Sequence, residues 1–241
     1  MVAFVLSRLA WTCLLAYLFL FLVLDSAIVR QFDVDDSRKM LGRLHRITAG
    51  TFFTGLAILS FYYYRFHRKP RPYPPAPGVS LLAIWVGSLT VYGLLLLPAF
   101  TRIVGRTEAA LITRPFSLAL NLVCTLALIA EGVTLVKNFR ACQNQRQRAM
   151  LTLRALLIGV SAVLLVVLFG LHASLSSQID QAQHTGFVAA HKIYLFVVTA
   201  QWLVNLALLF TPQVFNPFLL DSPRLQRVLN FGRKQPAHSA V

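Results

Sequence analysis

Six apolar runs, each long enough to cross a lipid bilayer, constrain this sequence more than any other feature. They cover Val2 to Leu24, Leu44 to Tyr64, Val79 to Phe100, Pro115 to Val136, Leu151 to Leu171 and Phe187 to Phe210. A helix that crosses a hydrocarbon core of about 30 Å needs roughly 20 apolar residues. Backbone groups in lipid must be satisfied within the segment, and the alternating pattern of a membrane β-barrel is missing. The sequence therefore predicts an all-α, polytopic membrane helix bundle with six transmembrane helices.

Composition points to the same class of protein. Hydrophobic residues make up 57% of the chain and charged residues 13%, whereas soluble domains have roughly 45–50% and about 25%. The 23 Lys and Arg residues outnumber the 8 acidic ones, but they lie in short clusters between the apolar runs. This distribution favours lipid headgroups as the anionic partner and argues against nucleic acid. Arg8 and the run after it are expected to be a retained anchor, because no small-residue cleavage site follows.

The distribution of basic residues predicts an orientation. With the N-terminus in the cytoplasm, fourteen Lys and Arg residues fall on the cytoplasmic side and nine on the other side. Because basic residues accumulate on the cytoplasmic side of membrane proteins, we expect both termini to be cytoplasmic. The expected location is a bacterial-type plasma (inner) membrane.

Three segments are expected along the chain. Residues 1–78 form two transmembrane helices and a Pro-rich connection, residues 79–212 a four-helix transmembrane bundle, and residues 213–241 a basic cytoplasmic tail. Within the connection, Arg71, Pro74 and Pro77 have the spacing of an SH3-domain ligand. A short interhelical position at the membrane surface favours a stiff polyproline strap instead.

Small residues and a cluster of acids predict local contacts. Pairs four residues apart allow close helix packing, namely Gly50 with Thr54, Thr51 with Gly55, and Ala83 with Gly87. Before the second run lie Asp33, Asp35 and Asp36, which lack calcium-loop spacing. We expect Asp36 or Ser37 to cap the helix that follows.

Histidines supply the candidate metal or haem ligands. His45 and His191 occur in the similar triplets HRI and HKI, each at the start of a run on the predicted outer side, and His172 ends the fifth run on that same side. Two such histidines on different helices are the arrangement that a haem or a transition-metal ion needs. The alternative is that each is an ordinary interfacial residue at a helix end, and the sequence leaves both open.

Glu131 is the only carboxylate well inside a predicted transmembrane run. Ionised groups at that depth are costly, so they indicate either a structural ion pair or part of a proton or ion relay. Arg154 and Arg65 are its candidate partners. Further polar groups, Asn121, Gln201 and Asn205, are expected to line the interior or to join helices by hydrogen bonds.

No catalytic motif supports an enzyme, since GxSxG, HExxH and phosphate-binding glycine loops are missing from the sequence. The first hypothesis is a non-enzymatic membrane protein that moves, or confers tolerance to, a metal ion or small solute. The second is a membrane subunit that binds haem or another tetrapyrrole. The third is an accessory subunit that packs against other membrane proteins.

Part of the chain resembles a known family. WVGSLTVYGLLLLPAF (residues 85–100), GRTEAALITRPFSLALN (105–121) and FVAAHKIYLF (187–196) are similar to the four-span membrane domains of unknown function that include the cisplatin-resistance-associated transmembrane protein. That resemblance covers residues about 80–210. His45, Ala49, Gly50, Phe53 and Gly55 also approximate a pattern of copper-resistance membrane proteins of the D type. Both resemblances imply handling of metals or small solutes.

Overall fold

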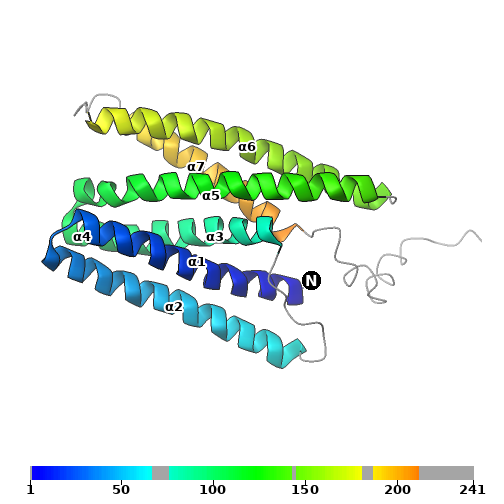
Figure 1. Cartoon of the computed structure of the whole chain (residues 1–241), viewed down its shortest axis with the longest axis horizontal. Coiled ribbons are helices and arrows are strands. Elements are labelled where there is room, and N and C mark those ends of the chain that lie inside the picture. Colours follow the sequence, from blue (N-terminus) through cyan, green and yellow to red (C-terminus); the bar gives the residue numbers. More distant parts are fainter. Residues whose placement is uncertain (1, 67–75, 143–144, 181–186, 212–241) are drawn as a thin grey trace, which may run out of the picture.

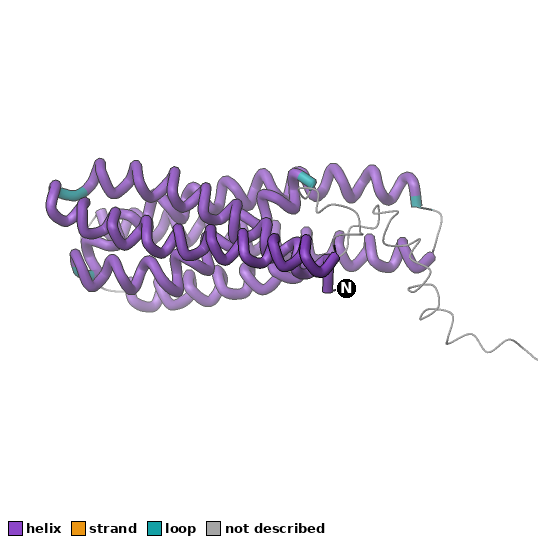
Figure 2. Tube along the Cα trace, turned by 90° about the horizontal axis from the view of Figure 1, so that it is seen from below, coloured by secondary structure: helices purple, strands orange, loops and turns teal. Residues whose placement is uncertain are grey.

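The computed structural model describes residues 2–66, 76–142, 145–180 and 187–211, and these residues are almost entirely helical. The helices run along one long axis and form an elongated bundle (Figures 1 and 2). Their order is α1 (Val2–Gln31), α2 (Val34–Phe66), α3 (Pro77–Val91), a π-helical turn η1 (Tyr92–Leu96), α4 (Leu97–Val104), α5 (Arg106–Ala141), α6 (Gln145–Asp180) and α7 (Phe187–Phe210). The all-α helix bundle expected from the sequence is thereby confirmed.

If α3, η1 and α4 are taken as one helix, each helix runs in the direction opposite to the one before it (Figure 1). The bundle therefore has two ends. We call the end with the start of α1 the proximal end; it also holds the end of α2, the start of α3, the end of α5, the start of α6 and the end of α7. The other is the distal end. Figure 1 shows α2 and α6 at opposite edges of the bundle.

The stretch from α3 through η1 to α4 is one interrupted helix. The π-turn ends at Leu96, two residues before Pro98, whose missing N–H and bulky ring disturb the regular hydrogen-bond ladder. Gly105 alone joins α4 to α5, with φ at 87°. Only glycine adopts this left-handed backbone without steric cost, which is why the chain reverses here within a single residue.

Glycines bring α1 close to its two neighbours. A Cβ placed on Gly55 of α2 would lie 3.0 Å from the Cβ of Cys13, and one placed on Gly87 of α3 would lie 2.8 Å from the Cβ of Ala16. Gly50 has no atom of another helix within 4 Å of such a position. Of the predicted small-residue pairs, those containing Gly55 and Gly87 therefore mark close helix approaches.

The distribution of side chains is the reverse of that in a soluble protein. Large apolar residues face outward along the whole bundle, for example Leu126 on α5, Val166 on α6 and Phe196 on α7, whereas Glu131 and Arg154 are buried. Soluble monomers rarely expose continuous apolar surface of this extent. This pattern fits an environment of lipid around the bundle.

Five helices of the described part of the chain are long and apolar enough to cross a membrane. They are Val2–Gln31, Pro77–Val104, Arg106–Ala141, Gln147–Ser177 and Ala189–Phe210. The remaining expected transmembrane helix, from the run Leu44 to Tyr64, lies in α2. This helix is 33 residues long but is less apolar than the other five. Its first half carries Arg38, Lys39, Arg43 and Arg46, and its second half is diluted by small residues and tyrosines.

Two local expectations need correction. The cap of α2 is Asp33, whose carboxylate accepts a hydrogen bond from the backbone N–H of Asp36 at 2.8 Å, while Ser37 donates to carbonyls at the end of α1. In addition, α5 begins at Arg106, nine residues before the apolar run that starts at Pro115. A helix can continue past its apolar run because its backbone hydrogen bonds also form in the membrane–water interface.

Candidate functional site

An ion pair between Glu131 of α5 and Arg154 of α6 lies near the proximal end of the bundle. The side chains are only 1% and 3% exposed. Arg154 donates from Nη2 to Oε2 of Glu131 at 2.5 Å and from Nε to the same oxygen at 3.1 Å. We call this pair the charged lock. Of the two candidate partners for Glu131, the structure therefore selects Arg154 rather than Arg65.

Helix ends complete the charged lock. Nη1 of Arg154 donates to the carbonyl oxygens of Leu208 and Thr211, at 3.3 and 2.9 Å, at the C-terminus of α7. A Cβ placed on Gly78, in the first turn of α3, would lie 2.6 Å from Oε1 of Glu131. The cation thus meets the negative end of one helix dipole and the carboxylate the positive end of another. The lock joins α3, α5, α6 and α7.

A third charge lies near the charged lock. Arg8 of α1 is half-buried and interacts electrostatically with both Glu131 and Arg154. With Arg8 beside the charged lock, two cationic side chains lie near one carboxylate, a surplus of positive charge on the predicted cytoplasmic side.

The polar residues of α5, α6 and α7 lie in register with one another. An interval of seven residues, which is two helical turns, recurs on all three helices: from Cys124 to Glu131, from Arg154 to Ser161, and from Tyr194 to Gln201. Because α5 and α6 are antiparallel, the contact between Glu131 and Arg154 places Cys124 opposite Ser161. Each helix therefore presents one polar line to the common interface, which we call the polar seam.

Four side chains meet in the middle of the polar seam, about 10 Å along α5 from the charged lock. The Ser161 hydroxyl donates to Oδ1 of Asn205 at 2.7 Å. Nδ2 of Asn205 and Nε2 of Gln201 both donate to the Cys124 sulfur, at 3.4 and 3.3 Å. All four residues are buried. Together with Trp85, Ser88 and Asn121 they form what we call the central layer.

Several polar atoms at this level have no hydrogen-bond partner. Among the described side chains these buried atoms include Ser88 Oγ, Asn121 Nδ2, Gln201 Oε1 and Trp85 Nε1. Gly78 of α3 faces Glu131 of the antiparallel helix α5, so ten residues further along α3 Ser88 lies at the level of Asn121. A buried polar atom without a partner costs about 1–3 kcal/mol. Their concentration at one level therefore requires an explanation.

At the distal end, the polar seam opens into a pocket of about 90 Å³. Its lining residues come from α5, α6 and α7, and they are Ala110, Thr113, Arg114, Ser117, His172, Leu175, Ser176, His191 and Tyr194. We call it the distal pocket. It brings together two of the three histidines singled out in the sequence. Sites for drug-sized ligands measure about 300–1,000 Å³, so a tetrapyrrole does not fit between His172 and His191 in this conformation.

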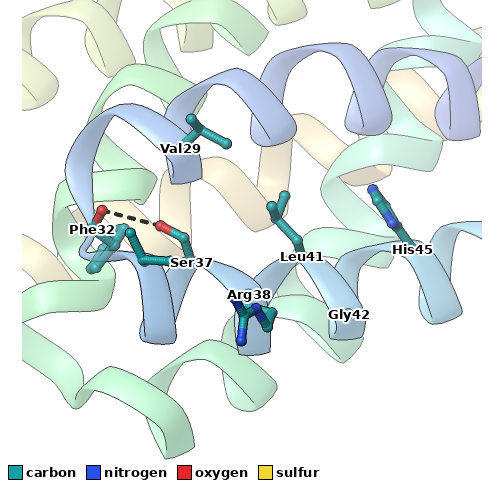
Figure 3. A pocket seen from close by; sticks show the side chains of 8 residues that line it. Val29, Phe32, Ser37, Arg38, Leu41, Gly42 and His45 are labelled. Carbon is teal, nitrogen blue, oxygen red and sulfur yellow. Dashed lines mark hydrogen bonds between the residues drawn. The ribbon is translucent and has the colours of Figure 1, made fainter.

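The third histidine lies elsewhere. His45 of α2 approaches Asp25 of α1, with Nε2 3.4 Å from Oδ1, and its ring stacks on Phe21. It lines an open hollow of about 490 Å³ between the end of α1 and the start of α2 (Figure 3). Both side chains of the pair are about half exposed. The structure thus does not bring His45 to His191, and the arrangement is that of an interfacial residue beside a half-exposed carboxylate.

Sequence reasoning missed several members of these sites. They are Cys124, Ser161, Arg114 and Tyr194, each a single polar residue within or next to an apolar run. The repeated interval of seven residues was the available signal. In the described residues, no group of three or more His, Cys, Asp or Glu side chains is placed to hold a metal ion. The expected strap around Arg71 and Pro74 and the basic tail lie outside the described residues.

No protein-family model, curated protein or solved structure matches this chain. The resemblances to the four-span membrane family and to copper-resistance proteins of the D type thus stay predictions from the sequence. The function must be argued from the bundle itself.

Proposed function

We propose that this chain is an integral membrane protein that binds a small, uncharged polar solute in its central layer and passes it along the polar seam. The unpaired atoms of the central layer carry the proposal. They comprise donors on Asn121 and Trp85, an acceptor on Gln201 and a hydroxyl on Ser88. A molecule with both donors and acceptors, such as water, urea or glycerol, complements this set.

The neutral side chains of the central layer favour an uncharged solute over an ion. The hydrogen-bonding groups of the central layer are amides, hydroxyls, an indole and a thiol, all neutral in their ordinary forms. The charged lock lies two turns away and its opposite charges pair with each other. A neutral solute is bound there without the large cost of burying an unpaired charge.

Apolar side chains separate the central layer from both ends. Leu128 lies between Cys124 and Glu131 on α5, and Leu165 and Leu168 lie between Ser161 and His172 on α6; all three are buried. In this conformation the central layer is closed, with the charged lock on one side and the distal pocket on the other. Passage therefore requires these leucines to move.

We also propose six transmembrane helices with both termini cytoplasmic, in a plasma membrane, and the packing of α2 supports the sixth helix. Although α2 is less apolar than the others, it lies antiparallel along α1 (Figure 1). A helix that follows a spanning neighbour over this length crosses the same layer of lipid. The division of fourteen against nine basic residues along the sequence supports a cytoplasmic location for both termini.

Site-directed labelling tests this orientation. Val34 and Tyr64 lie near opposite ends of α2 and are 73% and 83% exposed. We expect a membrane-impermeant maleimide to label Val34→Cys in intact spheroplasts, and to label Tyr64→Cys only after the membrane is permeabilised. The unsubstituted chain supplies the background from its three native cysteines. Labelling of both positions from the same side would contradict the six-helix orientation.

Solute movement is measured in proteoliposomes. Stopped-flow light scattering follows the entry of water, urea and glycerol after an osmotic step. We expect at least one of these probes to enter several times faster than into protein-free liposomes of the same lipid. If all three enter at the protein-free rate, the proposed passage is wrong.

A second function, that of an accessory subunit, is favoured by one observation. On the outer side of α6, Gly159 and Gly170 lie three turns apart, and no atom of another helix is within 4 Å of either position. Open small-residue positions let a helix of another membrane protein approach closely. Native mass measurement in mild detergent separates the two functions, because an accessory subunit is recovered with a second chain.

A further inference from the structure

The distal pocket differs from the central layer in its chemistry. Its polar lining groups are a guanidinium, two imidazoles, a phenol and aliphatic hydroxyls. All of these groups donate hydrogen bonds, and a guanidinium cannot accept one. The described lining residues include no carboxylate. This is the lining expected around a negatively charged oxygen ligand.

One guanidinium and two imidazole rings face the same space. Arg114 of α5 interacts electrostatically with His172 of α6, and His191 of α7 lines the pocket beside them. Arg114 and His191 also interact with other groups of the protein. An anion in this space meets the positive charge of Arg114 and the ring N–H groups of the two histidines. The planar fork of arginine matches the oxygens of a phosphate group.

The size of the pocket limits the ligand. A volume of about 90 Å³ holds only a few water molecules. A tetrahedral oxyanion group is of this size, whereas a nucleotide or a tetrapyrrole is far larger. The pocket therefore fits a single phosphate-like group.

Depth in the bundle indicates one source of such a group. Arg114 lies 17 residues before Glu131 on α5, which is about 25 Å along the helix. With a hydrocarbon core of about 30 Å, the charged lock and the distal pocket lie near its two boundaries. Leu111 and Leu118, one turn to either side of Arg114, face outward and offer surface for acyl chains.

We propose that the distal pocket, formed by Arg114, Ser117, His172, His191 and Tyr194, is a binding site for an oxyanion group, supplied by an anionic phospholipid or by free phosphate. The proposal stands on the pocket alone and does not depend on solute passage through the central layer.

Two binding measurements on the purified full chain separate the sources. Calorimetric titration with inorganic phosphate tests the free ion, and native mass spectrometry with added phosphatidic acid tests the lipid headgroup. Binding of phosphatidic acid without binding of phosphate identifies a headgroup site, and the converse identifies a site for the free ion. Binding of neither probe would overturn the proposal.

Variants tie the binding to the pocket. One of the two probes, phosphate or phosphatidic acid, is expected to bind to the unsubstituted chain. We expect Arg114→Gln to bind that probe at least tenfold more weakly. Arg106→Gln is the matched control, because Arg106 is an exposed arginine of the same helix that does not line the pocket, and it should bind like the unsubstituted chain. Wild-type affinity in Arg114→Gln would overturn the proposal.

A second variant keeps the test decisive if Arg114→Gln does not fold. The double substitution His172→Phe and Tyr194→Phe keeps ring volume and removes two donor groups from the pocket. We expect it to be recovered as a monodisperse protein that binds the probe at least tenfold more weakly. Unchanged affinity in this variant likewise contradicts the assignment.

Discussion

Replacing either member of the charged lock alone is expected to lower the free energy of unfolding by about 3–5 kcal/mol. Glu131→Ala leaves the Arg154 guanidinium, 3% exposed, without a carboxylate. Arg154→Ala leaves the Glu131 carboxylate buried without its guanidinium partner, and also removes the donor that holds the C-terminal carbonyls of α7. Either change removes the opposite charge from beside a charge in a low-dielectric interior, which accounts for the size of the effect.

The double substitution Glu131→Leu and Arg154→Met is expected to recover most of this loss. Removing both charges together abolishes the desolvation cost, and apolar residues of similar volume fill the space. A recovery of this kind assigns the single-variant losses to an unpaired charge. If the unfolding free energy of the double variant falls by the sum of the two single losses instead, each side chain stabilises the bundle through other contacts.

The protein supplies its own probe for this measurement. Cys124 is fully buried, so a thiol-reactive dye reports its exposure when the detergent-solubilised bundle is heated or titrated with denaturant. Glu108→Ala is the matched control because Glu108 is an exposed carboxylate of the same helix. It should change the unfolding free energy by less than about 0.5 kcal/mol. If Glu131→Ala and Glu108→Ala have the same unfolding free energy, the charged lock does not stabilise the fold.

The sequence predicted the helices because the thickness of the bilayer core fixes the length of an apolar run. It predicted their ends less well, since α5 begins at Arg106 and α6 continues to Asp180, beyond the runs. Once past the hydrocarbon core, a helix keeps its hydrogen bonds without apolar side chains. Run length therefore sets a minimum for a helix and not its boundaries.

The polar sites show a different limit. Glu131 stood out because it is a carboxylate in an apolar run, but choosing Arg154 over Arg65 required the register between α5 and α6. Cys124 and Ser161 became significant only when Gln201 and Asn205 were found against them. Pairing between distant helices is a property of the packed bundle, so single residues carry little signal for it.

Asn205→Leu is expected to abolish solute passage, reducing entry of the permeant probe to the rate in protein-free liposomes. Asn205 joins Ser161 to Cys124, accepting from one and donating to the other. Leucine has similar volume but no hydrogen-bonding group, so it removes the centre of the polar layer and adds an apolar barrier. The matched control is Thr199→Leu, an exposed polar residue of the same helix, which should leave the rate unchanged.

A further variant distinguishes a loss of stability from a loss of solute passage. Asn205→Leu strands the buried Ser161 hydroxyl, which costs about 1–3 kcal/mol, and adding Ser161→Ala removes that hydroxyl and should restore most of the stability. Passage should remain abolished in the double variant, because the central layer then lacks two of its polar groups. If the stabilised double variant instead passes the probe at the wild-type rate, the central layer is only a hydrogen-bonded contact between helices. A stable fold without passage would show that these polar groups are kept at the centre of the bundle for the solute.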